Sequence, residues 1–373
     1  MALALAAAQI DAQAAAEPDA EPARLGFAYV SDHFAGDASA LQAALQQRWP
    51  DCSWVGCAAV GVSACGAEYI DEPALSLMLA PLPESSFEVF SGARPLPAGG
   101  RWHSALLHAD PQAPELQELI HDMAGRVDSG YLFGGLVSSR SVAAQFAGGA
   151  FEGGLTGVAF APSVDLISRV TQGCQPVGPE RVVTAAERNL VLELDGRPAL
   201  DALLADLDIT LEQPRLALPR LRATLAGLTA GDAALIGRGA QFGPDVRVRH
   251  VLGLDPGRQA VAVAEIVEPG MRLAFCTRDV DAARRDLVRI CSEIRDELDP
   301  GDGRPARTIA GAIYISCAGR GGPHFGGDSA ELQIVRHALG EVPLVGFFGA
   351  GEIARHHLYG YTGVLTVFVN PAA

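Results

Sequence analysis

The chain contains no lysine, so all 28 of its basic residues are arginine. Without lysine there can be no Walker A phosphate loop, no Schiff-base lysine and no pyridoxal-phosphate site. Positive charge is also scarce, because 44 Asp and Glu residues give the chain a formal net charge of −16. Nucleic acids and anionic membrane surfaces both attract clustered positive charge. The sequence therefore predicts neither a nucleic-acid partner nor a membrane partner.

Long apolar runs and paired cysteines are missing as well. No run reaches the 18 apolar residues or so that predict a membrane-spanning helix. The seven cysteines are odd in number, include no C-x-x-C pair and have the wrong spacing for zinc, so we expect no metal and no cofactor. Most of them lie in apolar runs, where a thiol behaves as a small hydrophobe. Free thiols are typical of a reducing compartment, which predicts a cytoplasmic protein.

Apolar sequence, by contrast, is abundant. With 373 residues, 49% of them hydrophobic, the chain can build two or three cores. Residues 1–22 are rich in alanine and lack the positive start of a secretory signal, so we expect a disordered or loosely helical tail there. Strand-like and helix-like segments alternate after it, and hairpins outnumber clear crossovers. The pattern predicts an α+β fold with layers of mixed sheet.

One pattern occurs twice in the sequence, near the start and near the end. The first copy contains Gly26–Ser31, Asp37, Leu41, Val55-Gly56 and Gly61, and the second contains Gly311–Ser316, Asp328, Leu332, Val345-Gly346 and Gly351. Each copy predicts a strand, a small-residue loop, an amphipathic helix and a second strand that runs into glycines. We therefore predict two pseudo-duplicated lobes that superpose segment on segment. Such lobes usually bind a ligand between them or in matching pockets.

Two hairpins are predicted between the copies. Residues 246–267 alternate around Asp255-Pro256-Gly257, and residues 144–160 are expected to turn at Glu152-Gly153-Gly154. Residues 208–246 contain scattered prolines and glycines, and we place a boundary between domains in this region.

The stretch Cys317–His324 has the strongest chemical character in the chain. It follows a predicted strand, where ligands gather in layered α/β folds. Its glycine-rich backbone and Arg320 together suit a carboxylate, and Glu352, after Gly349-Ala350-Gly351, suits an ammonium group. The alternative interpretations are a flexible loop with a solvated arginine and an ordinary surface carboxylate.

Arg320 and Glu352 follow two strands that we expect to be neighbours, because the Ser329–Leu339 helix forms the crossover between them. The two side chains would then bind the two ends of an amino-acid-like zwitterion, and without a ligand they could pair with each other. Replacing either with Ala is expected to lower affinity more than stability. The complete set of predicted ligand-binding residues is Arg320, Glu352, Ser316 and Gly351, with Ser31 and Gly56 from the first copy.

Catalysis by Cys317, with His324 as its base, is an alternative for the same stretch. Glycine-rich chain between these two residues fixes no geometry, and buried inert thiols are far commoner than reactive ones. His356 and His357 are weak metal-ligand candidates, because adjacent residues of a strand point to opposite faces. We therefore predict neither a catalytic residue nor a metal ligand.

Three ordered groups of segments resemble the FIST family. They are Val170–Gly178 with Val182–Leu190 and Leu192–Ala199; Arg249–Asp255 with Pro269-Gly270 and Phe275–Asp279; and Ser316–Arg320 with Val345–Glu352 and Thr362–Val369. Their order is consistent from about residue 25 to residue 371, so the resemblance covers nearly the whole chain. One departure is Gly346-Phe347-Phe348, where Gly-Phe-Tyr is commoner in the family, and this change would alter the shape of a pocket.

FIST proteins are intracellular sensory modules of bacterial signal transduction. The resemblance implies a FIST N-terminal module, placed at residues 25–222, and a FIST C-terminal module, placed at residues 223–373, both proposed to bind small ligands such as amino acids. We expect a cytoplasmic, non-enzymatic sensory protein that binds a small polar, amino-acid-like metabolite and acts on a signalling protein partner. The alternatives are a cysteine-dependent hydrolase or transferase that uses Cys317, and a structural adaptor without a ligand.

Overall fold

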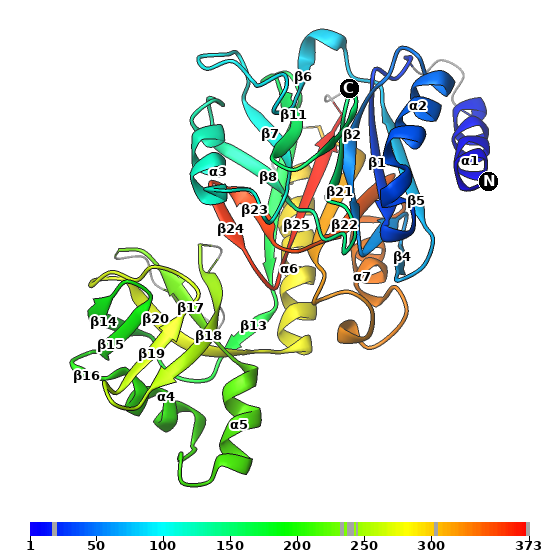
Figure 1. The fold of residues 1–373 in the computed structure, drawn as a ribbon. Coiled ribbons are helices and arrows are strands. Elements are labelled where there is room, and N and C mark those ends of the chain that lie inside the picture. The colour runs from blue at the N-terminus through cyan, green and yellow to red at the C-terminus, as the bar shows by residue number, and fades with distance from the viewer. Residues whose placement is uncertain (17–20, 232–234, 237–241, 244, 302–304, 371–373) are drawn as a thin grey trace. The chain divides into compact units, whose positions relative to one another are not determined.

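The computed structural model describes residues 1–16, 21–231, 235–236, 242–243, 245–301 and 305–370. The chain divides into two compact units, each drawn in Figure 1: unit 1 comprises Met1–Thr171 and Leu287–Ala373, and unit 2 comprises Gln172–Asp286. Unit 2 is thus an insertion in the sequence of unit 1. This division differs from the linear modules expected at residues 25–222 and 223–373, whose boundary stays a prediction.

Unit 1 contains the same arrangement three times. The first repeat consists of β1 (Leu25–Ser31), η1 (Asp32–Asp37), α2 (Ala38–Arg48), β2 (Ser53–Ala59), β3 (Gly61–Ala64), β4 (Ala67–Ile70) and β5 (Leu75–Ala80). The second consists of β7 (Ser104–Ala109), α3 (Leu116–Ala124), β8 (Tyr131–Leu136), β9 (Ala144–Ala147), β10 (Ala150–Glu152) and β11 (Leu155–Phe160). The third consists of β21 (Ile309–Cys317), η3 (Gly322–Phe325), α7 (Ala330–Leu339), β22 (Leu344–Gly349), β23 (Glu352–Arg355), β24 (His357–Tyr359) and β25 (Thr362–Val369).

Each repeat follows one topology. Its first two strands pair in parallel across a helix, and its last strand returns antiparallel to the first. The intervening hairpin leaves its own repeat and joins the sheet of another: β3–β4 pairs with β22, β9–β10 pairs with β2, and β23–β24 pairs with β8. The hairpins are therefore exchanged in a closed ring, so each repeat needs the other two to complete its sheet.

The three sheets are named here by the repeat that supplies their central pair of strands. The first sheet has the order β10-β9-β2-β1-β5, the second β24-β23-β8-β7-β11-β6, and the third β12-β25-β21-β22-β3-β4. Outside the three repeats, β6 (Phe87–Phe90), which η2 (Glu84–Ser86) precedes, extends the second sheet, and β12 (Leu166–Gln172) extends the third. The long helix α6 (Val280–Leu298) also lies outside the repeats. A common hydrophobic core draws on all three sheets, including Tyr29, Leu106, Phe133, Ile313 and Phe347.

One glycine in each repeat fixes the close approach of the two parallel strands. A Cβ on Gly56, Gly134 or Gly346 would lie 1.8 Å, 2.1 Å or 1.7 Å from the carbonyl oxygen of the residue opposite it, Ala28, Leu107 or Tyr314. These equivalent contacts confirm the predicted match between Val55-Gly56 and Val345-Gly346, and they add Phe133-Gly134 as a third copy. The predicted strand–helix–strand order of the two copies is confirmed.

The predicted alignment of the first strands is wrong by one residue. Ala28 pairs with Gly56 and Tyr314 pairs with Gly346, so Gly26 is equivalent to Ala312 and Ser31 to Cys317. A shift of one residue moves every side chain of a strand to the other face of the sheet. Tyr29 accordingly lies in the common core, while Tyr314 faces the helical side and contacts Glu331 of α7.

The α1 helix (Ala2–Ala16) precedes the first repeat, so most of the expected tail is a regular helix. Leu3 packs against the cluster that contains Trp54 and Phe146, and Ala7 is buried. Residues 17–20 of the expected tail lie outside the described residues. None of the described helices is long and apolar enough to cross a membrane.

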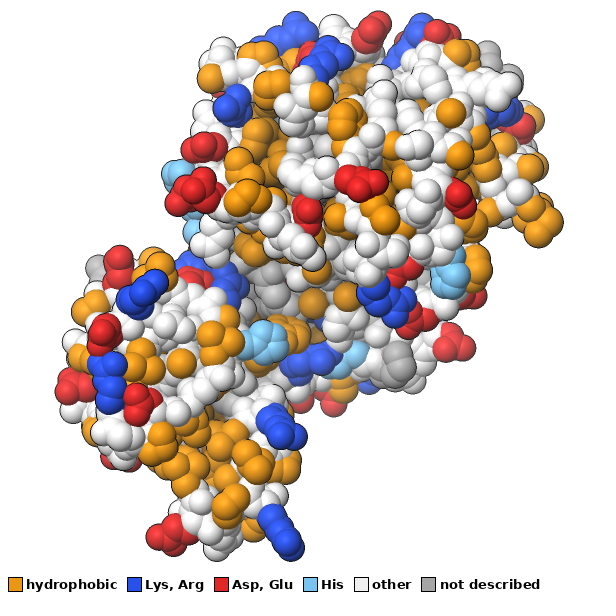
Figure 2. Space-filling model, in the orientation of Figure 1, with side chains coloured by type: hydrophobic (Ala, Val, Ile, Leu, Met, Phe, Trp, Pro, Cys, Tyr) orange, Lys and Arg blue, Asp and Glu red, His pale blue; other side chains and the backbone are white. Residues whose placement is uncertain are grey.

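Unit 2 is a mixed α and β unit of its own. It consists of β13 (Cys174–Pro176), β14 (Arg181–Glu187), β15 (Leu190–Leu194), β16 (Arg197–Pro198), α4 (Ala199–Leu207), α5 (Pro214–Ala223), β17 (Thr224–Thr229), β18 (Arg247–Asp255), β19 (Ala260–Val263) and β20 (Arg272–Arg278). Its strands run antiparallel around a core that includes Leu200, Leu203 and Phe275. Figure 2 shows apolar side chains over α4 and α5, where Leu216 and Leu218 are exposed.

The α+β class with mixed sheets is confirmed. The hairpin predicted over residues 246–267 is confirmed as β18–β19. The hairpin predicted over residues 144–160 is wrong: β9 turns into β10 at Gly148-Gly149, and β11 pairs with β6 and β7 in the second sheet. Gly153 and Gly154, both with positive φ, instead mark the passage from one sheet to another.

Candidate functional site

Three equivalent rows of side chains face one another at the centre of unit 1. Residues directly opposite on paired strands share a face, so each row follows from the strand register. The row of the first sheet is Ser76, Tyr29, Cys57 and Gln145. The row of the second sheet is Thr156, His108, Gly135 and Glu352, and the row of the third is Val364, Ile315, Phe347 and Val62. We call these residues the central layer.

The rows make direct contact across the core. Tyr29 Oη lies 3.2 Å from His108 Nε2, and the Phe347 ring lies 5.1 Å from the Tyr29 ring and 5.8 Å from the imidazole. Thr156 Oγ1 donates to Gln145 Oε1 at 2.8 Å. Two of the rows are thus largely polar and the third is apolar. Polar side chains at the centre of an otherwise hydrophobic core reduce stability unless they are fully hydrogen-bonded, so their presence calls for a functional explanation.

Tyr29 and His108 are both neutral near pH 7. Burial raises the pKa of Tyr29 well above its usual range, with a further contribution from Cys57, and burial lowers the pKa of His108 to about 3. Because Tyr29 keeps its proton, it is best satisfied as the donor to His108 Nε2, and the neutral imidazole then carries its own proton on Nδ1. We therefore assign His108 the tautomer in which Nδ1–H is the hydrogen-bond donor.

Three polar atoms of the central layer have no hydrogen-bond partner among the described residues. They are Ser76 Oγ, His108 Nδ1 and Glu352 Oε1. All three side chains are buried, and those of His108 and Glu352 are 0% exposed. A buried polar group without a partner lowers stability by about 1–3 kcal/mol. His108 and Glu352 also flank the same residue, Gly135, on the same face of the second sheet.

Glu352 opens the β23 strand and is held at one oxygen only. The Thr362 backbone N–H and Oγ1 donate to Glu352 Oε2 at 3.2 Å and 2.7 Å. Burial raises the pKa of Glu352 to about 8, although the Thr362 bonds and the Arg320 charge act in the opposite direction. At pH 7 the carboxyl is therefore mostly protonated and carries no charge. A cation placed beside Oε1 would change this balance in favour of the carboxylate.

Gly135 leaves room that two side chains of the third sheet occupy. A Cβ on Gly135 would lie 2.8 Å from Ile315 Cγ2 and 3.1 Å from Phe347 Cζ. The tips of these apolar side chains therefore lie above the glycine, in the row between His108 and Glu352. The phenyl group of Phe347 is the larger of the two and also contacts the imidazole.

Arg320 lies in a separate buried cluster on the helical side of β21. Its Nε and Nη2 donate to Glu331 Oε1 at 3.0 Å and 2.8 Å, and Tyr314 Oη and Ser316 Oγ also donate to this carboxylate, at 2.6 Å and 2.9 Å. Burial alone would lower the pKa of the guanidinium, but Glu331 and other acidic groups outweigh it and raise the pKa.

The pairing of Arg320 differs from the expected one. Its Nη1 points to the Thr171 and Tyr361 carbonyl oxygens at 3.5 Å and 3.4 Å, and the side chain is 0% exposed. Arg320 is thus paired with Glu331 and not with Glu352. Its guanidinium is committed to protein groups, and the idea that it binds a ligand carboxylate stays a prediction.

The other predicted ligand-binding residues are dispersed. Ser31 Oγ, at the end of β1, accepts from the Ala74 N–H at 3.0 Å, and Gly56 packs against the Ala28 carbonyl. Ser316 is engaged by Glu331, as described. The Gly351 carbonyl accepts from the Leu136 N–H at 2.8 Å and so joins the third repeat to the second. Of the predicted set, Glu352 alone belongs to the central layer.

Cys317, half-buried at the end of β21, has the character of an unreactive thiol. Its pKa is raised to about 12, mainly by burial and in smaller part by the neighbouring Glu352 carboxyl. His324 lies in η3, where its ring is 5.7 Å from the Phe325 ring. The His356 and His357 ring centroids lie 3.9 Å apart with the rings tilted by 48°, yet the described part of the chain holds no group of three His, Cys, Asp or Glu residues suited to a metal ion.

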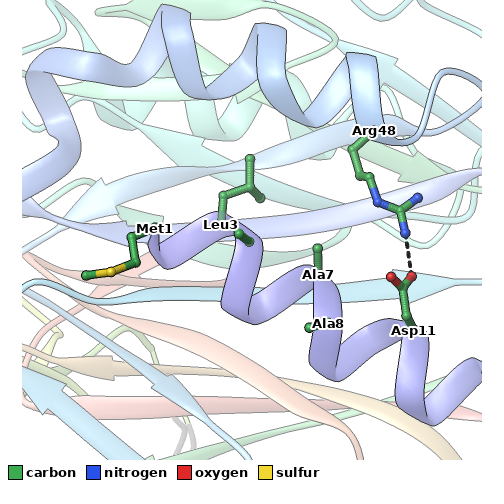
Figure 3. Close-up of a pocket in the computed structure, with 7 residues that line it drawn as sticks. Met1, Leu3, Ala7, Ala8, Asp11 and Arg48 are labelled. Atoms are coloured by element: carbon green, nitrogen blue, oxygen red, sulfur yellow. Dashed lines mark hydrogen bonds and ion pairs between the residues drawn. The ribbon is translucent and has the colours of Figure 1, made fainter.

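A shallow surface pocket lies between α1 and α2 (Figure 3), and its lining differs from the polar rows of the central layer. Its lining is mostly apolar and includes Met1, Leu3 and Ala7. The charged groups that face it, Asp11 and Arg48, pair with each other at 2.5 Å. The pocket therefore offers a ligand little specific recognition.

Sequence reasoning missed Tyr29, His108, Gln145 and Thr156 as a group. The available signal was a polar residue in each of several short apolar strands, such as His108 in Ser104–Ala109. Such residues have no shared motif, and the register that brings them together depends on the exchanged hairpins.

Comparison with known proteins agrees with the segments noted in the sequence. The FIST N domain matches residues 24–197, and the FIST C domain matches residues 199–355. The uncharacterized protein Rv0628c of Mycobacterium tuberculosis (strain ATCC 25618 / H37Rv) is 30% identical over 332 residues, which cover 81% of this chain and 80% of that protein. The uncharacterized protein Mb0898c of Mycobacterium bovis is 32% identical over 233 residues, which cover 58% of this chain and 54% of that protein. The chain therefore belongs to the FIST family, whose domains are associated with sensory signal transduction.

Proposed function

We propose that this protein is a cytoplasmic, non-enzymatic sensor that binds a small polar, amino-acid-like metabolite and signals its presence to a protein partner. The binding step uses Glu352, whose buried carboxyl receives the ammonium group of the ligand. The family supports the sensory part of this proposal.

The observation that carries the proposal is the half-satisfied carboxyl of Glu352. Its Oε2 has two donors from Thr362, whereas its Oε1 has no partner in the described part of the chain. With a pKa of about 8, the group is uncharged when alone at pH 7 and becomes an anion when a cation approaches. An ammonium group would supply both the missing donor and the compensating charge.

The state of Cys317 supports a binding role over the hydrolase or transferase alternative. A thiol needs a neighbouring base or cation to become a nucleophile at neutral pH. The surroundings of Cys317 do the opposite, because burial, with a smaller contribution from the neighbouring Glu352 carboxyl, raises the pKa of the thiol to about 12. This environment suits a packed thiol beside a ligand site.

A thermal-shift and calorimetric screen of the common L-amino acids and ω-amino acids tests the proposal. A ligand that binds only the folded protein stabilises it by about 2.7 kcal/mol at 100 times its dissociation constant. Glu352→Gln keeps the hydrogen bonds from Thr362 but cannot become an anion, so it should bind the same ligand about tenfold or more weakly.

The matched control is Glu341→Gln, which alters a carboxylate whose side chain is 79% exposed and paired with Arg336. This variant should bind like the wild-type protein. If no amino acid raises the melting temperature of the wild-type protein, or if Glu352→Gln and Glu341→Gln bind equally well, the proposed function is wrong.

A further inference from the structure

The central layer holds a second polar group that complements Glu352. His108 Nδ1, assigned above as the protonated nitrogen of the imidazole, has no partner among the described residues. It lies in the same row as Glu352, with Gly135 between them. Adjacent strands are about 4.8 Å apart, so the backbones of His108 and Glu352 are separated by about two such spacings. The side chains rise from the same face into the same core.

The two groups differ in a way that a zwitterion would match. His108 Nδ1–H donates and suits a carboxylate, whereas Glu352 Oε1 suits an ammonium group. Arg320, which the sequence favoured for the carboxylate, is engaged by Glu331 and by two backbone carbonyl oxygens. Gly135 contributes no side chain to the row, so the space above it is not filled from the second sheet.

We propose that the metabolite binds inside unit 1, above Gly135, where it takes the place of the Phe347 phenyl group. Its ammonium group contacts Glu352 and its carboxylate contacts His108. This inference rests on the proposed function and specifies the site and the ligand class. The ligand is a short amino acid whose two charged ends are far enough apart to reach both side chains. Phe347 fills the site in the free protein and leaves it when the ligand enters.

Phe347 acts in this scheme as a plug that couples binding to the rest of the fold. Its ring contacts Tyr29 and His108, and its Cζ lies 3.1 Å from the position of a Cβ on Gly135. Phe347 belongs to β22, which is paired with β3 of the exchanged hairpin and with β21. Displacement of the ring therefore perturbs strands of two repeats, which gives a sensor its structural output.

The neighbouring Phe348 provides a matched control. It lies on the same strand and is equally buried, but its ring packs near Gly321, on the other face of the third sheet. Phe347→Ala and Phe348→Ala remove the same group and both create a cavity. Only the first should remove the plug from the ligand site.

The probes form a series in which the charged ends are increasingly separated: glycine, β-alanine and γ-aminobutyrate. Propionate and propylamine are the matching analogues of β-alanine that lack the ammonium and the carboxylate. We expect at least one amino acid of the series to bind Phe347→Ala about tenfold or more tightly than wild type, because the competent state no longer requires displacement of the ring. Phe348→Ala should show no such gain.

Testing the ligand analogues against the protein variants shows which side chain binds which charged end of the ligand. Removing the ammonium from the ligand should weaken binding to wild type about tenfold or more, and should matter little in Glu352→Gln. Removing the carboxylate should matter little in His108→Phe. His108→Gln retains an N–H donor and an acceptor for Tyr29, so it should keep the carboxylate discrimination that His108→Phe loses.

The outcomes separate this inference from the proposed function. If an amino acid binds in a Glu352-dependent way, but Phe347→Ala and His108→Phe bind like Phe348→Ala, the ligand does not lie above Gly135 and this inference is wrong. If no zwitterion binds and Glu352→Gln has no effect, the proposed function itself fails. Gain of affinity in Phe347→Ala together with loss of carboxylate discrimination in His108→Phe supports the site.

Discussion

Arg320→Ala should greatly destabilise unit 1. The guanidinium is 0% exposed and gives two hydrogen bonds to Glu331 Oε1, at 3.0 Å and 2.8 Å. Its removal leaves Glu331 buried with Tyr314 and Ser316 as its donors among the described residues. Breaking a buried ion pair by removing one partner lowers stability by about 3–5 kcal/mol, since the remaining charge is uncompensated. This expectation reverses the one from the sequence, in which Arg320 was to affect affinity more than stability.

Urea denaturation followed by tryptophan fluorescence would measure the loss. The three tryptophans, Trp49, Trp54 and Trp102, all belong to unit 1, so the signal reports this unit without a contribution from unit 2. The control is Arg140→Ala. Arg140 also pairs with two carboxylates, Asp32 and Asp71, but its side chain is 60% exposed.

Exposed ion pairs contribute little, so Arg140→Ala should leave the urea midpoint almost unchanged. Equal midpoints for the two variants would refute the reasoning, because burial is what distinguishes the two arginines. A large loss in Arg320→Ala with an unchanged slope of free energy against urea concentration would support it.

Three further predictions address other parts of the account. Burial raises the pKa of Glu352 from 4.5 to about 8, so between these pH values the folded protein holds a proton that the unfolded chain releases. The free energy of unfolding should therefore fall as the pH rises from about 4.5 to 8. Urea midpoints measured across this range should depend less on pH in Glu352→Gln than in the wild-type protein. Gly134→Ala places a Cβ 2.1 Å from the Leu107 carbonyl oxygen and should lower the urea midpoint by the equivalent of about 1–3 kcal/mol or more, whereas Gly36→Ala, with no atom within 4 Å, should change it little. Cys317→Ser should leave ligand affinity nearly unchanged in calorimetry, and a thioester or amide hydrolase activity abolished by this change would favour the enzyme alternative.

The sequence revealed the fold only in part, because the glycine pattern that identifies a repeat is complete in two of the repeats and incomplete in the other. Two copies share the Val-Gly pair and a second glycine five residues later, at Gly61 and Gly351. The middle copy retains Phe133-Gly134 but has Ser139 in place of the second glycine. The close approach of parallel strands requires the first glycine in all three, whereas the second position depends on local packing. The second repeat therefore became visible only through the contact between Gly134 and Leu107.

The candidate site was harder to predict than the fold. Glu352 was proposed from the sequence because it follows a strand and a small-residue turn, but its neighbours in the central layer depend on pairings across exchanged hairpins. The wrong hairpin at residues 144–160 hid the link between Gln145 and Thr156, and the one-residue shift in the first strand hid the different faces of Tyr29 and Tyr314. The pairing of Arg320 with Glu352 was wrongly predicted, because a glycine-rich loop gave no sign that its arginine would be buried against Glu331.

Proton release on binding tests the central claim most directly. Glu352 is mostly protonated at pH 7 in the free protein, and an ammonium group against Oε1 should convert it to the carboxylate. Calorimetric titrations of the bound amino acid in buffers of different ionisation enthalpy measure the protons exchanged. The account predicts that wild-type protein releases close to one proton per ligand and that Glu352→Gln releases none. Binding without proton release in the wild-type protein, or with the same release in Glu352→Gln, would contradict it.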